Sequence, residues 1–164
     1  MKYRMILLLC LLFFSLNTLT ACSQEKTMTD TTNEIFQIIA KQNLSELEHW
    51  LAKSPNLELK NQKGETPLMA ATYLNQVPMA KLLIAAGANV NTQDGMLNSP
   101  FLYAGASGYL EIVKLCLKAG ADYQVFNRYN GTALIPACEK GHVAVVEELL
   151  KDKTYPINHI NRLG

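Results

Sequence analysis

The sequence has little of what an enzyme or a nucleic-acid-binding protein usually shows. Its 164 residues carry 15 Lys and Arg against 14 Asp and Glu, a net charge of +1, which gives no electrostatic case for nucleic acid. It contains no phosphate-binding loop, no G-x-S-x-G turn around a nucleophilic serine and no paired-carboxylate motif. We therefore expect no nucleic-acid partner, no small-molecule substrate and no cofactor.

The sequence also lacks an apolar run long enough to span a bilayer, which takes about 20 residues. The run MILLLCLLFF at residues 5–14 follows Lys2 and Arg4 and precedes a group of small residues. A basic start, a short apolar run and a small-residue exit are typical of an export signal, here predicted at residues 1–21. A buried N-terminal helix is the alternative interpretation of this segment.

The exit of the predicted signal, Leu19-Thr20-Ala21-Cys22, resembles the lipobox of bacterial lipoproteins. The resemblance implies that Cys22 becomes the mature N-terminus and carries lipid, whose acyl chains anchor the protein to a membrane. Ser23, where an Asp would favour the inner membrane, favours the outer one. Residues 22–32 are polar and aperiodic, as in a tether. The predicted location is the periplasmic side of a bacterial envelope membrane; a soluble export signal with an incidental Cys22 is the alternative.

The rest of the chain repeats itself every 33 residues. Corresponding triplets with this spacing are Thr66-Pro67-Leu68, Ser99-Pro100-Phe101 and Thr132-Ala133-Leu134, and later Gly87-Ala88-Asn89 and Gly120-Ala121-Asp122. The hydroxyl residue that opens each of the first three can cap a helix, and proline fits the first helical turn. The glycines fit the end of a second helix. Each period therefore predicts two helices.

This pattern resembles the ankyrin repeat, which has 33 residues and a T-P-L-H-x-A opening. The resemblance implies an all-α solenoid of helix–turn–helix units joined by β-hairpin-like loops over residues 33–164. We expect repeats at 66–98, 99–131 and 132–164. Residues 33–65 form a degenerate unit with polar outer residues, as a terminal cap requires.

Several positions depart from the pattern. Leu97 replaces the turn glycine Gly64, so that hairpin is expected to be irregular, and Pro136 inside a predicted first helix removes a helical hydrogen bond. The glycine motif becomes Lys153-Thr154-Tyr155 in the last unit. Residues 161–164 echo the lead into the previous unit. We therefore expect a continuation of the natural chain, or a partner, over the last unit, which sizing and thermal melting would test.

Three residues of the last unit could carry chemistry. Cys138, Glu139 and His142 could form part of a metal site and support a metal-dependent enzyme. No second Cys/His cluster completes the ligands, however, and Gly141-His142 matches the break between two ankyrin helices, so we expect neither a metal nor catalysis. Cys138 and Cys116 lie at predicted apolar helix positions. They are expected to be buried free thiols rather than a disulfide.

The ankyrin resemblance implies a protein partner held on a concave face by hairpin tips and first-helix ends. Carried over by position, the candidate binding residues are Lys63, Glu65, Tyr73, Met96, Asn98, Arg128, Tyr129 and Lys140. The predicted function is a non-catalytic interaction module at the envelope that protects, scaffolds or inhibits another protein. A secreted effector that acts on host proteins is the alternative, and it differs only in destination.

Overall fold

The computed structural model of the chain describes residues 34–163, so the predicted export signal, Cys22 and the tether lie outside the described residues. A helical segment at 34–40 is followed by seven helices: α2 (Leu44–Leu51), α3 (Pro67–Tyr73), α4 (Val77–Ala85), α5 (Pro100–Ser107), α6 (Leu110–Lys118), α7 (Leu134–Glu139) and α8 (Val143–Leu149). Residues 34–163 contain no strand, which confirms the all-helical fold class. None of the helices in this range is long and apolar enough to cross a membrane.

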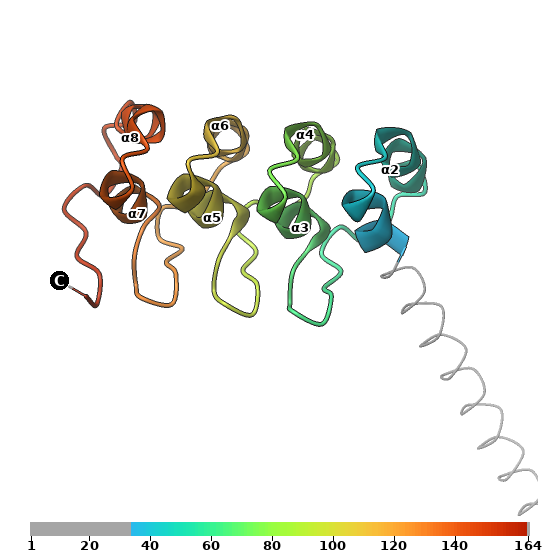
Figure 1. Cartoon of the computed structure of the whole chain (residues 1–164), viewed down its shortest axis with the longest axis horizontal. Coiled ribbons are helices and arrows are strands. Elements are labelled where there is room, and N and C mark those ends of the chain that lie inside the picture. Colours follow the sequence, from blue (N-terminus) through green and yellow to red (C-terminus); the bar gives the residue numbers. More distant parts are fainter. Residues whose placement is uncertain (1–33, 164) are drawn as a thin grey trace, which may run out of the picture. The chain divides into compact units, whose positions relative to one another are not determined.

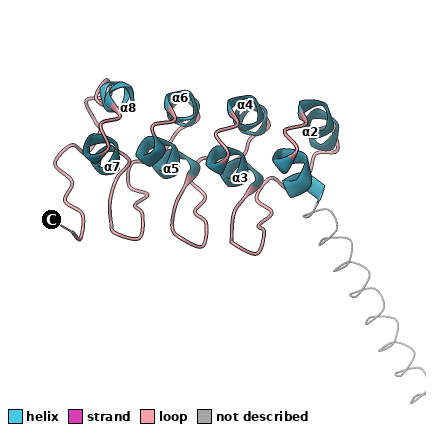
Figure 2. Ribbon diagram, in the orientation of Figure 1, coloured by secondary structure: helices cyan, strands magenta, loops and turns pink. Residues whose placement is uncertain are grey.

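The helices stack in two rows that run along the repeat axis (Figure 1). Helices α3, α5 and α7 pack on one another in one row, and α2, α4, α6 and α8 pack successively in the other. The loops between units all extend on the side of the α3–α5–α7 row, as the loop colouring in Figure 2 shows. One apolar core runs through the stack, in which Leu83, Cys116 and Leu149 are fully buried at equivalent positions 33 residues apart.

The 33-residue period is present in the backbone as well as in the side chains. Residues with positive φ fall into three series at this spacing: Gln42, Asn75, Gly108 and Gly141 after the first helices; Ser54, Gly87 and Gly120 after the second helices; and Gly64, Leu97 and Asn130 in the hairpins. Glycine takes this conformation at no steric cost, whereas other residues do so at about 1–2 kcal/mol. The stacked units therefore impose a common backbone path even where glycine is absent.

The expected irregularity of the second hairpin is wrong. Leu97 has φ 60°, close to the 74° of Gly64. Its N–H donates to Asp94 O at 3.1 Å, just as Gly64 N–H donates to Asn61 O at 2.9 Å. Leu97 keeps the turn because the hairpin is held at both ends by hydrogen bonds, which offset the local strain.

Two of the three predicted helix caps are confirmed. Thr66 Oγ1 accepts a hydrogen bond from Met69 N at 3.2 Å, and Ser99 Oγ accepts one from Leu102 N at 3.2 Å. A proline follows each cap in the first helical turn, where its missing N–H costs nothing. These contacts explain why α3 and α5 begin where the sequence pattern indicates.

The third cap, Thr132, is wrong: its hydroxyl is buried and has no hydrogen-bond partner within the described chain. Pro136 also lacks the N–H that would bond to Thr132 O, as Ala70 N does to Thr66 O at 2.9 Å in α3. Helix α7 begins only at Leu134, whose N–H donates instead to the Tyr155 hydroxyl at 3.2 Å. A buried tyrosine from the segment after α8 thus supplies the acceptor that the local sequence does not.

The two cysteines in the described range are both free, but only one is buried. Cys116 lies in the core, and burial raises the pKa of its thiol to about 12. Cys138 is exposed, so the expectation of a buried thiol there is wrong. Its counterpart Gly105 is covered by Ala133 of the following unit, whereas no described unit packs over Cys138.

Candidate functional site

The candidate site is the surface formed by the hairpins and the adjoining ends of α3, α5 and α7, which we call the hairpin face (Figure 2). Each hairpin is organised by one Asn or Asp side chain, whose Oδ1 accepts hydrogen bonds from the backbone N–H groups two and four residues further on. These residues are Asn61, Asp94 and Asn127, and the six N–H to Oδ1 distances lie between 2.8 and 3.0 Å. The sequence interpretation missed them, although their 33-residue spacing was a readable signal.

Neighbouring hairpins are also tied to each other. Gly95 N donates to Lys63 O at 3.1 Å, and a Cβ on Gly64 would lie only 2.8 Å from Gly95 N, so the close approach requires glycine at position 64. One hairpin further on, Gln93 Nε2 donates to Phe126 O at 2.7 Å. These bonds hold the hairpins in one arrangement, which lowers the ordering cost of binding a partner.

Tyr73 and Asn98, both predicted binding residues, are engaged within the protein. The Tyr73 hydroxyl donates to Asp94 Oδ2 at 2.5 Å and accepts from Asn98 Nδ2 at 3.2 Å. Burial and the hydrogen bond to Asp94 raise the pKa of Tyr73, so the hydroxyl stays protonated and acts as a donor at neutral pH. The Tyr73 ring also packs edge-on against Tyr103, with 4.3 Å between ring centroids. This cluster joins α3, α5 and the second hairpin.

Two more predicted residues make internal hydrogen bonds. Glu65 is half-buried, and its carboxylate accepts from Asn61 Nδ2 at 2.6 Å. Lys140 is exposed, and its Nζ donates to Ala106 O at 2.7 Å. Both bonds are local supports of the hairpin face, so neither side chain reaches a partner without giving up a contact.

The other four predicted residues have side chains that make no hydrogen bond within residues 34–163. Met96 and Tyr129 are large, apolar and exposed, at 49% and 43%. Arg128 lies over the Tyr129 ring, with its guanidinium carbon 4.9 Å from the ring centroid. Lys63 is exposed at the tip of the first hairpin. Methionine, tyrosine and arginine are enriched at protein interfaces, so these side chains remain candidates for partner contact.

The structure gives His142 a packing position rather than a ligand set. A Cβ on Gly108 would lie 2.7 Å from His142 Nδ1, so the imidazole packs against the turn of the preceding unit. Within residues 34–163, no group of three or more His, Cys, Asp or Glu side chains could hold a metal ion. The arrangement that the structure does present is a set of exposed side chains on a rigid surface.

Comparisons with known proteins agree with this architecture. The family model for ankyrin repeats (three copies) matches residues 10–94, 35–127 and 95–161. The putative ankyrin repeat protein YahD of Escherichia coli K12 is 33% identical over 114 residues, which are 70% of this chain and 57% of YahD. A putative ankyrin repeat protein of Rickettsia felis is 32% identical over 87% of this chain and 60% of its own length. The chain thus spans less than two thirds of either relative.

Two solved structures are similar in both fold and sequence. A crystal structure of an ankyrin repeat domain from Acinetobacter baumannii AYE has a TM-score of 0.76 and 42% identity, covering 79% of this chain and 66% of that one. The ankyrin repeat protein EF0377 has a TM-score of 0.77 and 36% identity, covering 81% and 68%. Ankyrin repeats are protein–protein interaction modules that generally perform no catalysis. The stacked 33-residue units, the matched family model and these relatives show that the chain belongs to the ankyrin-repeat family, with relatives in bacteria.

Proposed function

We propose that this protein holds a protein partner on its hairpin face and performs no reaction itself. The observation that carries the proposal is the exposure of Met96 and of the Arg128–Tyr129 pair on hairpins that are already rigid. Exposed aromatic and arginine side chains supply much of the binding energy at interfaces. The hydrogen-bonded hairpins beneath them lower the entropy lost on association.

We further propose that the protein acts at the bacterial envelope, anchored by lipid at Cys22 and facing the periplasm, with the outer membrane favoured. Support comes from the basic start, the short apolar run and the Leu19-Thr20-Ala21-Cys22 segment. In that location the module would protect, scaffold or inhibit an envelope protein. A secreted effector acting on host proteins is the second candidate, because the same signal without lipidation would release the protein.

The partner proposal is tested by affinity capture from an envelope extract. The double variant Arg128→Ala/Tyr129→Ala should lose one specific protein that the unaltered chain retains. The matched control is Glu111→Ala/Lys114→Ala, which removes an exposed ion pair on α6, away from the hairpins. Equal recovery with all three proteins would contradict the assignment of the binding surface to the hairpin face.

The anchor proposal is tested by metabolic labelling with a fatty acid. The unaltered chain should incorporate label and fractionate with membranes, whereas Cys22→Ala should lose the label and appear in the soluble fraction. Secretion of an unlabelled protein with Cys22 intact would instead support the effector. This result is independent of the capture experiment, because the hairpin face folds from residues that lie far along the chain from Cys22.

A further inference from the structure

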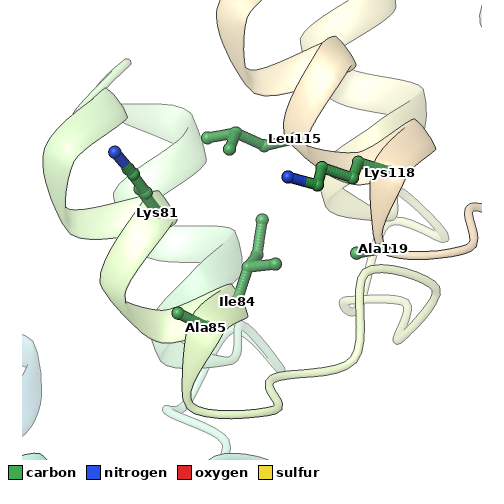
Figure 3. A pocket seen from close by; sticks show the side chains of 6 residues that line it. All are labelled: Lys81, Ile84, Ala85, Leu115, Lys118 and Ala119. Atoms are coloured by element: carbon green, nitrogen blue, oxygen red, sulfur yellow. The ribbon is translucent and has the colours of Figure 1, made fainter.

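A second surface feature lies away from the hairpins, between the outer helices α4 and α6. It is a groove of about 320 Å³ lined by Lys81, Ile84, Ala85, Leu115, Lys118 and Ala119. Figure 3 shows Ile84 reaching up from α4 and Leu115 and Lys118 reaching across from α6 into the space between the helices. The only polar side-chain groups in the lining are the two lysine ammonium groups. The floor is apolar because Ala85 and Ala119 are small and leave the hollow open.

The repeat provides internal controls for this groove. Shifted by one unit toward the C-terminus, the equivalent positions are Lys114, Leu117, Lys118, Glu148, Lys151 and Asp152. There two floor positions are acidic, and the lysines pair with Glu111 at 2.9 Å and Glu148 at 2.6 Å. Shifted the other way, the positions are Glu48, Leu51, Ala52, Leu82, Ala85 and Ala86, which hold an acid and no cation.

The α4–α6 groove therefore differs from its two neighbours in charge. Lys81 and Lys118 form no ion pair with any residue of the described chain. Lys118 lies in the last turn of α6, where positive charge also offsets the helix dipole. That reason does not apply to Lys81, which lies in the middle of α4. Two unpaired cations beside an apolar hollow match a ligand that is apolar along its length and negatively charged at one end.

We propose that this groove binds a free aliphatic monocarboxylate. The alkyl chain lies along Ile84 and Leu115, and the carboxylate is held by the ammonium groups of Lys81 and Lys118. A methylene occupies about the volume of a water molecule, roughly 30 Å³, so the groove accommodates roughly ten carbons. The ligand is bound and not transformed. The site uses no residue of the hairpin face, so it is independent of the proposed protein partner.

The test is a titration of the purified protein with decanoate below its micelle concentration, followed by amide NMR shifts. Saturable shifts should centre on Ala85 and Ala119. Lys81→Gln/Lys118→Gln should weaken binding about fivefold or more, because each exposed ion pair contributes modestly. The matched control Lys114→Gln/Lys151→Gln removes the same charge from the same outer surface, and it should change the dissociation constant less than about twofold.

Two further arms separate the apolar from the ionic contribution. Ala119→Leu fills the floor while keeping both lysines and should abolish the shifts. Decanol, which has the same chain and no charge, should bind at least about fivefold more weakly than decanoate.

Three outcomes would overturn the proposal. The first is the absence of saturable shifts at Ala85 and Ala119, and the second is an equal loss of affinity in both lysine double variants. The third is a loss of binding to anionic vesicles, or of a captured acidic protein, in Lys81→Gln/Lys118→Gln without any decanoate binding. That result would assign the groove to a membrane or protein contact instead.

Discussion

The central repeats and the last unit reach the same backbone path by different contacts. At residues 66–131 each first helix begins with its own hydroxyl cap, and each second helix ends at a glycine with positive φ. At residues 132–163 the expected cap, Thr132, has no hydrogen-bond partner within the described chain, and the equivalent of the glycine is Lys153. Tyr155, from the segment after α8, supplies the missing acceptor to α7.

This difference teaches that an ankyrin unit can keep its geometry when local signals are lost, provided that a neighbouring segment replaces them. The replacement is visible as burial: Tyr155 is 4% exposed, and its ring lies 4.6 Å from that of Tyr123. The last unit is also less enclosed. On α8, Val143 and Leu150 are 64% and 49% exposed, whereas their counterparts Leu110 and Leu117 on α6 are half-buried.

The largest expected effect compares one core position in the two regions. Leu83 and Leu149 are equivalent leucines, both fully buried, but Leu83 lies between two outer helices and Leu149 beside one. Leu83→Ala should cost about 4 kcal/mol of unfolding free energy and Leu149→Ala about 2, since the cost depends on how far the site can collapse. Urea unfolding measures both. Equal losses would show that the last unit is packed as tightly as the central ones.

The next effect concerns the helix starts. Ser99→Ala should lose about 1 kcal/mol, as for an ordinary cap. Tyr155→Phe should lose about 1 kcal/mol, because it leaves the Leu134 N–H without its acceptor. Thr132→Ala should be close to neutral, since its hydroxyl has no partner to lose. A loss at Thr132 with none at Tyr155 would restore the local cap that the sequence predicted.

A smaller effect concerns the ends of the second helices. Gly120 has φ 86° and no atom within 4 Å of an added Cβ, so Gly120→Ala should cost only the left-handed backbone strain, about 1 kcal/mol. Lys153→Ala at the equivalent position of the last unit should stay within about 0.5 kcal/mol, as exposed substitutions usually do. Thermal unfolding measures the pair. A comparable loss at Lys153 would mean that the last turn is as constrained as the central one.

The last prediction leaves stability unchanged and reports burial directly. In the folded protein, the exposed thiol of Cys138 should react with an alkylating reagent at least about 100-fold faster than that of Cys116, because the thiolate is the reactive form and burial raises the pKa of Cys116 to about 12. Peptide mass spectrometry after timed labelling measures both. Denaturant should bring the two rates together, and similar rates without denaturant would contradict the difference in burial.

Much of the fold could be predicted because its signals are local and repeated. Pro67 and Pro100 mark helix starts, and Gly87 and Gly120 mark helix ends, each through backbone preferences that act within a few residues. The candidate site was predictable only by position. The pattern placed Tyr73 and Asn98 near the partner-binding surface, but it could not show that both are hydrogen-bonded to each other or that Asp94 joins them.

The sequence by itself therefore determined the period, the helix pairs and the family, because each unit repeats the same short-range preferences at the same spacing. Tertiary structure alone decided which residue completes a helix start, as with Tyr155, and which thiol is exposed, as with Cys138. It also decided that Arg128 and Tyr129 remain available while Glu65 does not. The physical reason is that burial and hydrogen-bond partners come from neighbouring units, which one unit's sequence does not encode.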